Sequence, residues 1–434
     1  MSNFSSSLDD FFAIREREVL PKHAGGLKSL DEIVQRQKDL SHRQSAGATL
    51  EYIASTTQTG VLSTNRLSMV YPRIEEFERL TAAGATVVLL RTVESEDNDP
   101  LEEQIFHENL VDQKDVPFGL TSSKVDPRGD VERALGAGFS YLTVGMYLAL
   151  RDSPRVDPLK VFADQAYQLR LTGALSQLGV NVVAEVVGGS FDPDVPPAMS
   201  IAMAVLESVF AVGCGNRNLV LRYSSLGNVV QDVAAMHVMR DIAKAEFADD
   251  VTVYVSAATW PGELPSHVGE AYAALSAGAM AAGLGGADLG AVDRLRGEEF
   301  DEWEDHVSAV QAERQLLDML EGQALENSDE LSLEESDLRD TVEAILLVVR
   351  GDESQTLHEQ MMSSASRGLF STGGGSIDFA VARDGSGAVR WIEKGEIPVP
   401  PKVLERDRRL LDSMGETPFE MNLIRRYVAR DSKS

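Results

Sequence analysis

Cysteine is almost missing from this chain of 434 residues, in which Cys214 is the single example. One thiol cannot form an internal disulfide, and it excludes the metal sites that need several cysteines. A chain so poor in cysteine is typical of a reducing compartment. Apolar runs are short as well: none approaches the ~18 residues of a membrane span, and no basic region followed by an apolar stretch opens the chain. We therefore expect a cytoplasmic protein without a membrane segment.

Basic residues are also scarce. The chain has 40 Lys and Arg against 69 Asp and Glu, a formal net charge of −29. Nucleic acids and anionic membrane surfaces bind cationic faces, so this charge argues against both as partners. The apolar share of 43% is ample for a core. The length suits one large domain with a smaller one attached.

The familiar catalytic motifs are absent from the sequence. It has no H-E-x-x-H, P-loop, C-x-x-C or G-x-S-x-G, and its seven histidines are scattered rather than paired at ligand spacing. We therefore predict no metal site. The glycine-rich segment 283–286 follows an alanine-rich helix, so it matches a dinucleotide-binding loop poorly. A helix cap or a close packing turn is the better interpretation.

What the sequence does contain, from Gly60 onward, is a series of short apolar strands that alternate with amphipathic helices. Strands of about 4–8 residues in such an order indicate parallel pairing through βαβ units. The α/β fold that we expect is a TIM (β/α)8 barrel over residues 55–326, although periodicity alone leaves a doubly wound sheet open. The expected strands are 85–90, 141–144, 180–187, 218–223 and 251–255, and the expected helices are 74–83, 131–137, 157–178, 198–213, 266–277 and 299–321.

Two segments flank the predicted barrel. Residues 1–54 are polar and helix-prone, which predicts an N-terminal helical arm. Residues 327–434 begin with acids, serines and leucines, and we expect them to form a small C-terminal α+β domain. Within it, an Asp-Gly turn between the apolar runs 379–381 and 388–391 predicts an antiparallel hairpin, and a last helix is expected over 403–428.

The segment 195–240 contains the strongest candidate for a binding site. In a parallel sheet or barrel, the turn after each strand lies at the carboxyl end, where ligands bind. The turn after strand 218–223 is 224–228, and Gln231 and Asp232 follow in the first turn of the next helix. Asn228, Gln231 and Asp232 are therefore candidate ligand-binding residues. The alternative is structural: Asn228 caps the helix, and Asp232 complements its dipole.

Glu185 is a carboxylate inside the apolar run 182–187. Burying a carboxylate without a partner costs several kcal/mol, so we expect Glu185 to face the barrel mouth or a partner. Near the end of a strand it is a candidate acid, base or ligand-binding group. A purely structural ion pair is the alternative.

A family resemblance is carried by segments spread over much of the chain. They are 195–200 (VPPAMS), 227–235 (GNVVQDVAA), 317–323 (LDMLEGQ), 389–391 (VRW), 395–398 (GEIP) and 418–421 (PFEM). In this order and spacing they resemble the epsilon (large) subunit of glutamate mutase, also called methylaspartate mutase. The resemblance extends from about Gly179 to Ser432.

The resemblance implies a barrel that holds adenosylcobalamin at its mouth, shared with a small sigma subunit that supplies the corrinoid's histidine ligand. It implies a radical interconversion of L-glutamate and threo-3-methylaspartate, in a heterotetramer that contains a homodimer of large subunits. A D-x-H-x-x-G corrinoid signature is absent here, as in a large subunit. By position, the resemblance assigns a substrate carboxylate to Arg66, a catalytic and ammonium-binding role to Glu185, and cofactor contacts to Asn228, Gln231, Asp232, Trp260, Gly262 and Pro265.

The sequence also departs from the family pattern. The family grips its substrate's carboxylates with three arginines, of which only Arg66 has an equivalent that we can assign. Leu264 replaces a phenylalanine, and a lysine–glutamate pair near 292–296 is missing. Two hypotheses remain open. The chain is either a catalytic large subunit of a cobalamin-dependent mutase that acts on an amino-dicarboxylate, or a non-catalytic or substrate-shifted relative that acts as a partner or regulatory subunit.

Overall fold

The computed structural model describes most of the chain. The described residues are 8–23, 27–40, 44–56, 58–66, 74–92, 116–122, 124, 126–152, 156–190, 195–259, 264–265, 267–293, 304–351, 354–366 and 379–413. In this part of the chain, no helix combines the length and the apolarity needed to cross a membrane.

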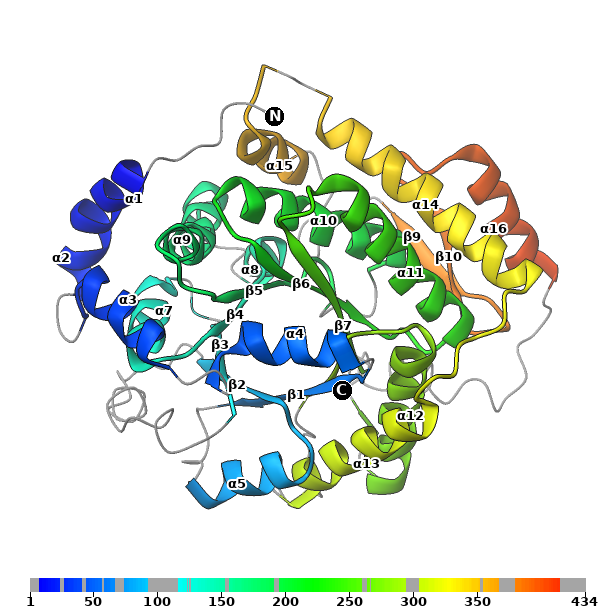
Figure 1. Ribbon diagram of the computed structural model, residues 1–434. Helices are drawn as coiled ribbons and strands as arrows, with labels where there is room; N and C mark the ends of the chain where they lie inside the picture. The colour runs from blue at the N-terminus through cyan, green and yellow to red at the C-terminus, as the bar shows by residue number, and fades with distance from the viewer. Residues whose placement is uncertain are drawn as a thin grey trace.

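Eight parallel strands close into a barrel in simple sequence order, with β1 paired to β8 (Figure 1). This confirms the predicted (β/α)8 barrel and rules out the doubly wound sheet. Short strands suffice because each strand is paired on both sides. The strands are β1 (Gly60–Arg66), β2 (Val87–Thr92), β3 (Phe118–Ser122), β4 (Tyr141–Val144), β5 (Val183–Val186), β6 (Asn218–Ser224), β7 (Thr252–Ala258) and β8 (Leu289–Asp293).

Helices surround the barrel in the predicted order, although α8 was not among the predicted ones. One predicted helix is clearly longer in the structure. Helix α12 runs on to Leu284 because its second half is rich in alanine, a strong helix former; Gly285 follows as its cap, so the glycine-rich segment 283–286 ends a helix as expected. Helix α13 is described from Glu304, and the predicted start of this helix at 299–303 lies outside the described residues. The helices are α5 (Ile74–Ala82), α7 (Arg128–Ala137), α8 (Met146–Asp152), α9 (Pro158–Gln177), α10 (Pro197–Gly213), α11 (Val229–Glu246), α12 (Val268–Leu284) and α13 (Glu304–Leu320).

The N-terminal arm lies against the outside of the barrel. It consists of α1 (Leu8–Ile14), the π-helix η1 (Arg15–Val19), α2 (Leu20–His23) and α3 (Leu30–Asp39). Buried Arg15 fastens it, because its guanidinium donates to both oxygens of Glu132 on α7 at 2.7–3.0 Å. Tyr167 of α9 donates to the same carboxylate.

Helix α4 (Ala46–Thr56) closes the amino end of the barrel (Figure 1). Its buried residues Ala46, Leu50 and Ile53 join the interior cluster formed by residues near the start of the strands, such as Tyr141 and Val183. The predicted arm thus divides into an outer part and a plug. Ligands can therefore approach the interior only from the carboxyl end, as is usual in such barrels.

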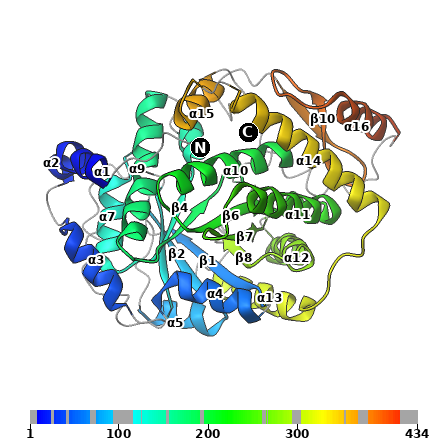
Figure 2. The same cartoon turned by 45° about the horizontal axis from the view of Figure 1, so that its top comes forward.

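The C-terminal elements form a layer over α10 and α11. Helix α14 (Asp329–Val349) packs against both, and α15 (Leu357–Ser366) contacts α9, α10 and α14 (Figure 2). The predicted hairpin is confirmed as β9 (Ala380–Arg383) paired antiparallel with β10 (Val389–Glu393). Helix α16 (Pro401–Ser413) packs on β10, and the rest of the predicted helix 403–428 lies outside the described residues. Residues of α14, α15, β10 and α16 share one apolar core cluster with the barrel.

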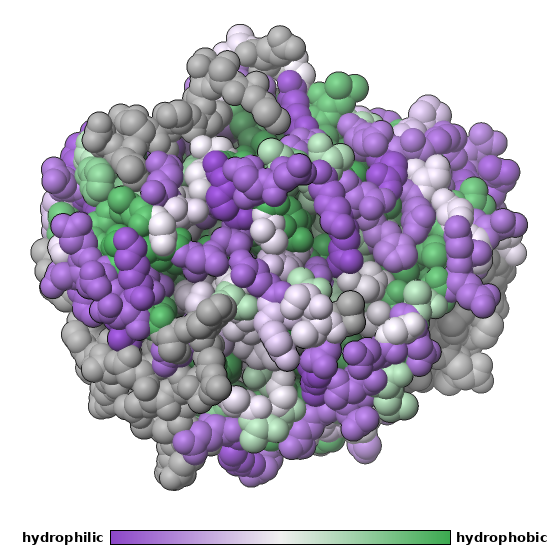
Figure 3. Space-filling model, viewed as in Figure 1, coloured by the Kyte–Doolittle hydropathy of each residue, from purple (hydrophilic) through white to green (hydrophobic). Residues whose placement is uncertain are grey.

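Hydrophilic side chains cover much of the face seen in Figure 3, with smaller apolar areas between them. The acidic excess of the sequence is compatible with such a surface. Not all charged side chains lie at the surface, because three of the scarce arginines are buried: Arg15, Arg222 and Arg390.

The plug generates a stability prediction. Leu50 has no exposed surface, and Leu50→Ala should lower the free energy of unfolding by about 2–5 kcal/mol, because a cavity would be left against the barrel interior. The matched control is Tyr52→Ala on the same helix, where the side chain is 65% exposed and the change should be within about 0.5 kcal/mol. Urea unfolding measures both. Equal effects would show that α4 does not plug the barrel.

Candidate functional site

Four neighbouring strands each place a polar side chain at the same level of the barrel interior. Tyr141, Val183, Val220 and Tyr254 on β4 to β7 belong to the interior cluster. Because side chains alternate along a strand, the residue two positions further on each strand also faces inward. These residues are Thr143, Glu185, Arg222 and Ser256.

These four side chains form one hydrogen-bonded group around Glu185. Arg222 donates from Nε to Oε1 at 2.9 Å and from Nη2 to Oε2 at 3.0 Å. Thr143 donates to Oε2 at 2.8 Å, and Ser256 donates to Oε1 at 2.9 Å. Each carboxylate oxygen therefore accepts two hydrogen bonds, which is about the full capacity of an ionised carboxylate.

Both members of the ion pair are fully inside the protein, with exposed side-chain fractions of 0% for Glu185 and 1% for Arg222. Glu185 was expected to face the barrel mouth or a partner, and its partner in the structure is Arg222, an ion pair of the kind that the structural alternative describes. Arg222 was not predicted as a site residue, although an arginine in the apolar strand 218–224 is a signal for one. Nearby, burial raises the pKa of Tyr141 well above its usual value, and the negative charge of Glu185 raises it further.

The turn between β6 and α11 is held from inside by Asp232. Its carboxylate accepts hydrogen bonds from Tyr223 Oη at 2.8 Å, Ser225 Oγ at 2.5 Å, and the backbone N–H groups of Leu226 and Gly227 at 2.9 and 3.1 Å. Burial raises the pKa of Asp232, and these hydrogen bonds oppose the rise. Asn228 caps α11, because its Oδ1 accepts from the N–H of Gln231 at 2.8 Å.

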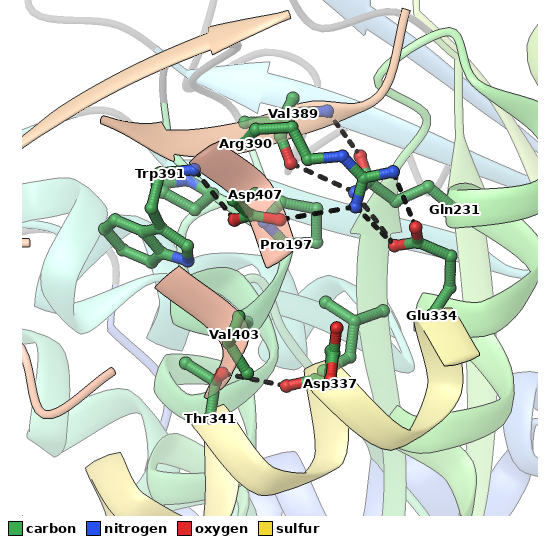
Figure 4. Close-up of a pocket in the computed structure, with 13 residues that line it drawn as sticks. Pro197, Gln231, Glu334, Asp337, Thr341, Val389, Arg390, Trp391, Val403 and Asp407 are labelled. Atoms are coloured by element: carbon green, nitrogen blue, oxygen red, sulfur yellow. Dashed lines mark hydrogen bonds and ion pairs between the residues drawn. The ribbon is translucent and has the colours of Figure 1, made fainter. Parts of the chain in front are cut away.

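The C-terminal hairpin is bound to this same turn. Asn228 donates from Nδ2 to the backbone oxygen of Ser386 at 2.9 Å, and Arg383 donates to the backbone oxygen of Leu226. The amide of Gln231 pairs with both backbone groups of Val389, at 2.8 and 3.1 Å (Figure 4). Asn228, Gln231 and Asp232 thus all lie at the carboxyl end of the barrel, where their polar groups fix the turn and the hairpin.

Arg390 anchors the hairpin from the other side. It pairs with Glu334 on α14 at 2.6 Å and with Asp384 at 2.7 Å, and it lies 3.7 Å from Asp407 on α16. A small pocket opens beside this cluster, between the amino ends of α10 and α11, α14, β10 and α16 (Figure 4). Burial raises the pKa of Asp407 to about 6, against the hydrogen bond from Trp391 N–H and the nearby Arg390.

The sequence comparisons with known proteins point to one family. The sequence model of the family "Methylaspartate mutase E chain (MutE)" matches residues 107–422. The chain belongs to the methylaspartate mutase E chain family. Among its relatives, the glutamate mutase epsilon subunit of Desulfitobacterium hafniense is 30% identical over 324 residues, which cover 70% of this chain and 66% of the relative.

Other relatives in the E chain family are more distant. The glutamate mutase epsilon subunit of Yersinia enterocolitica is 26% identical over 66% of this chain and 62% of its own length. That of Fusobacterium nucleatum is 22% identical over 92% of this chain and 86% of its own length. The chain thus spans slightly less than two thirds of the length of the first two of these relatives.

The remaining residues that the E chain resemblance singled out are placed only in part. Arg66 is the last residue of β1, and its side chain lies outside the described part of the structure. Its register partner on β2 is Arg91, which directly follows the apolar run 87–90 and was not predicted as a site residue. Trp260 and Gly262 lie outside the described residues, and Pro265 is half-buried after β7. The described residues form no group of three or more His, Cys, Asp or Glu that could hold a metal ion.

A second buried carboxylate lies close to the carboxyl ends of β4 and β5. Glu207 of α10 accepts from the N–H of Tyr147, in the first turn of α8, at 3.1 Å and from the N–H of Gly188, after β5, at 3.0 Å. Burial raises the pKa of Glu207 to about 7, although these hydrogen bonds oppose the rise. The carboxylate therefore ties two rim segments of the E chain to α10, and it titrates near neutral pH.

Glu207 should make stability depend on pH. Its folded-state pKa of about 7 lies above the ordinary 4.5, so the stabilisation is fully present below pH 4.5 and is lost as pH rises through about 7. Over this window the wild type should lose up to about 3 kcal/mol relative to Glu207→Gln. Urea unfolding of both at several pH values measures this, with exposed Glu343→Gln as the control that follows the wild type. Parallel curves for wild type and Glu207→Gln would refute it.

Proposed function

We propose that this chain is the large subunit of an adenosylcobalamin-dependent carbon-skeleton mutase, with the family's interconversion of L-glutamate and threo-3-methylaspartate as its reaction class. One observation carries the proposal. The segment that contains Gln231 and the segment that contains Val389 both carry the family resemblance, and they are bonded to each other at the carboxyl end of the barrel. Residues distant in sequence thus build one rim, at the end where barrel enzymes bind their ligands.

The described rim suits a large planar cofactor. Gly227 is exposed with a φ of 93°, so the turn presents bare backbone to whatever lies above it. Asn228, Gln231 and Asp232 would support the cofactor by fixing this turn against the hairpin. Trp260, Gly262 and Pro265 would add contacts from the segment after β7. Adenosylcobalamin would supply the carbon radical that starts the rearrangement, and the closed barrel would keep water from it.

The proposed substrate is a small dicarboxylate. Arg66 would bind one of its carboxylates, and Arg91 is a second candidate because its backbone is the register partner of Arg66 on the neighbouring strand. Guanidinium groups suit this task, since each can donate two parallel hydrogen bonds to a carboxylate. Glu185 is the proposed catalytic and ammonium-binding group if the substrate is an amino-dicarboxylate.

The proposed partner is a small sigma subunit that carries the corrinoid's histidine ligand, in a cytoplasmic heterotetramer built on a homodimer of large subunits. The subunit name of the relatives supports a multi-subunit assembly. The absence of a D-x-H-x-x-G signature from this sequence is consistent with a cofactor shared with another chain.

A second candidate function is favoured by the hydrogen bonds that the Glu185 carboxylate already accepts. Its carboxylate is already saturated by Arg222, Thr143 and Ser256, so it has no lone pair to offer to an ammonium group. This supports a substrate-shifted relative, or a non-catalytic one that keeps the fold and the assembly surface as a partner or regulatory subunit.

The proposed function is tested by mixing the purified chain with a sigma subunit and adenosylcobalamin. Cobalamin should bind weakly to the chain alone and at least tenfold more tightly when sigma is present, because a lower histidine ligand comes from sigma. A small dicarboxylate should then change the cofactor's visible absorption spectrum. Tight stoichiometric binding of cobalamin without sigma, or no binding with it, would contradict the large-subunit assignment.

A further inference from the structure

The charged side chains in the barrel interior are already paired with each other. Glu185 and Arg222 neutralise each other, and all four acceptor positions of the carboxylate are filled by Arg222, Thr143 and Ser256. A cation from outside could bind Glu185 only by displacing one of these donors. Displacing Arg222 would leave its guanidinium buried without a partner, which is strongly unfavourable, and displacing Thr143 or Ser256 would leave Arg222 in place to neutralise the carboxylate.

The next level toward the barrel mouth is built from small, uncharged residues. Ser224 follows Arg222 on the inward face of β6, and Ala258 follows Ser256 on β7. Ala291 on β8 is the register partner of Ala258, and both belong to the interior cluster. Among the side chains that the structure describes at this level on β6 to β8, none carries a charge.

Ser224 also offers a free polar group at this level. Its side chain is buried, with 3% exposed, and its Oγ has no hydrogen-bond partner among the described residues. A hydroxyl can donate or accept one neutral hydrogen bond, but it does not replace a carboxylate as the counter-ion of an ammonium group. On the β6 to β8 side, a ligand that enters from the mouth therefore meets alanine methyl groups and one hydroxyl before it meets the ion pair.

We propose that Arg222 is a specificity-determining residue, and that the barrel takes a dicarboxylate without an α-ammonium group in preference to an amino-dicarboxylate. This rests on the proposed function, which supplies the dicarboxylate class. Arg222 determines the specificity because it neutralises Glu185, the one interior carboxylate on β4 to β7. Without Arg222, this carboxylate could compensate for the loss of hydration of an ammonium group.

The experiment compares two ligands that differ only in the group at issue. Glutarate is L-glutamate without the ammonium, and its two carboxylates are separated by the same carbon chain. Isothermal titration calorimetry of the full chain, alone and assembled with sigma subunit and cofactor, should give at least tenfold tighter binding of glutarate than of L-glutamate. Tenfold tighter binding of L-glutamate, or binding of neither ligand, overturns the proposal.

Substitutions test whether the ion pair of Glu185 and Arg222 causes the preference for glutarate. Arg222→Met frees the carboxylate, so the ratio should shift at least tenfold toward L-glutamate; Glu185→Met/Arg222→Met removes both charges and should keep the preference for glutarate. If Arg222→Met does not fold, Arg222→Lys serves instead: it keeps the charge and should keep the preference. Arg217→Met is the matched control, because Arg217 precedes the same strand and pairs with Asp250 at the surface. An unchanged ratio in a folded Arg222→Met protein overturns the role of Arg222.

The two proposals fail in different ways. If glutarate binds preferentially but neither ligand changes the cofactor spectrum in the assembly, the specificity inference stands and the mutase function fails. If L-glutamate binds preferentially and changes the spectrum, the mutase function stands and Arg222 does not exclude the ammonium group.

Discussion

The buried ion pair between Glu185 and Arg222 is the interaction on which the interior of this barrel depends. A lone carboxylate or guanidinium at that depth would be strongly destabilising, so neither residue is tolerable without the other. The pair is possible because the barrel closes with β5 and β6 adjacent and keeps their inward faces in phase. Thr143 and Ser256, from the strands on either side, complete the hydrogen bonds that the carboxylate needs.

The same use of scarce basic residues recurs elsewhere in this acidic chain. Arg15 joins the N-terminal arm to Glu132 on a barrel helix, and Arg390 joins the hairpin to Glu334 on α14. Each is buried, and each connects segments far apart in the sequence. At the rim of the barrel, uncharged side chains also join distant segments, because Asn228 and Gln231 form hydrogen bonds between the hairpin and the β6–α11 turn. The mouth of the barrel is thus shaped by the C-terminal layer as well as by its own loops.

Periodicity predicted the alternating strands and helices, and the Asp-Gly turn predicted the hairpin, because these signals are local; periodicity alone did not separate a barrel from a doubly wound sheet. The cap at Asn228 was foreseen as an alternative for the same reason. The pairing of Glu185 with Arg222 was not foreseen, because it depends on strand register between residues 37 positions apart. The role of Gln231 was missed in a similar way, since its partner Val389 lies 158 positions away. Residues 46–54 were predicted as arm, but only tertiary packing shows that α4 plugs the barrel.

A double-mutant cycle on the ion pair tests the central claim most directly. The free energies of unfolding in urea would be measured for the wild type, Glu185→Met, Arg222→Met and the double variant. Each single substitution should cost about 3–5 kcal/mol, because it leaves one charge buried and unpaired, and the double variant should cost less than either single one. Additive losses, or single substitutions that each cost less than about 1 kcal/mol as exposed ion pairs do, would show that the two charges are not paired inside the barrel.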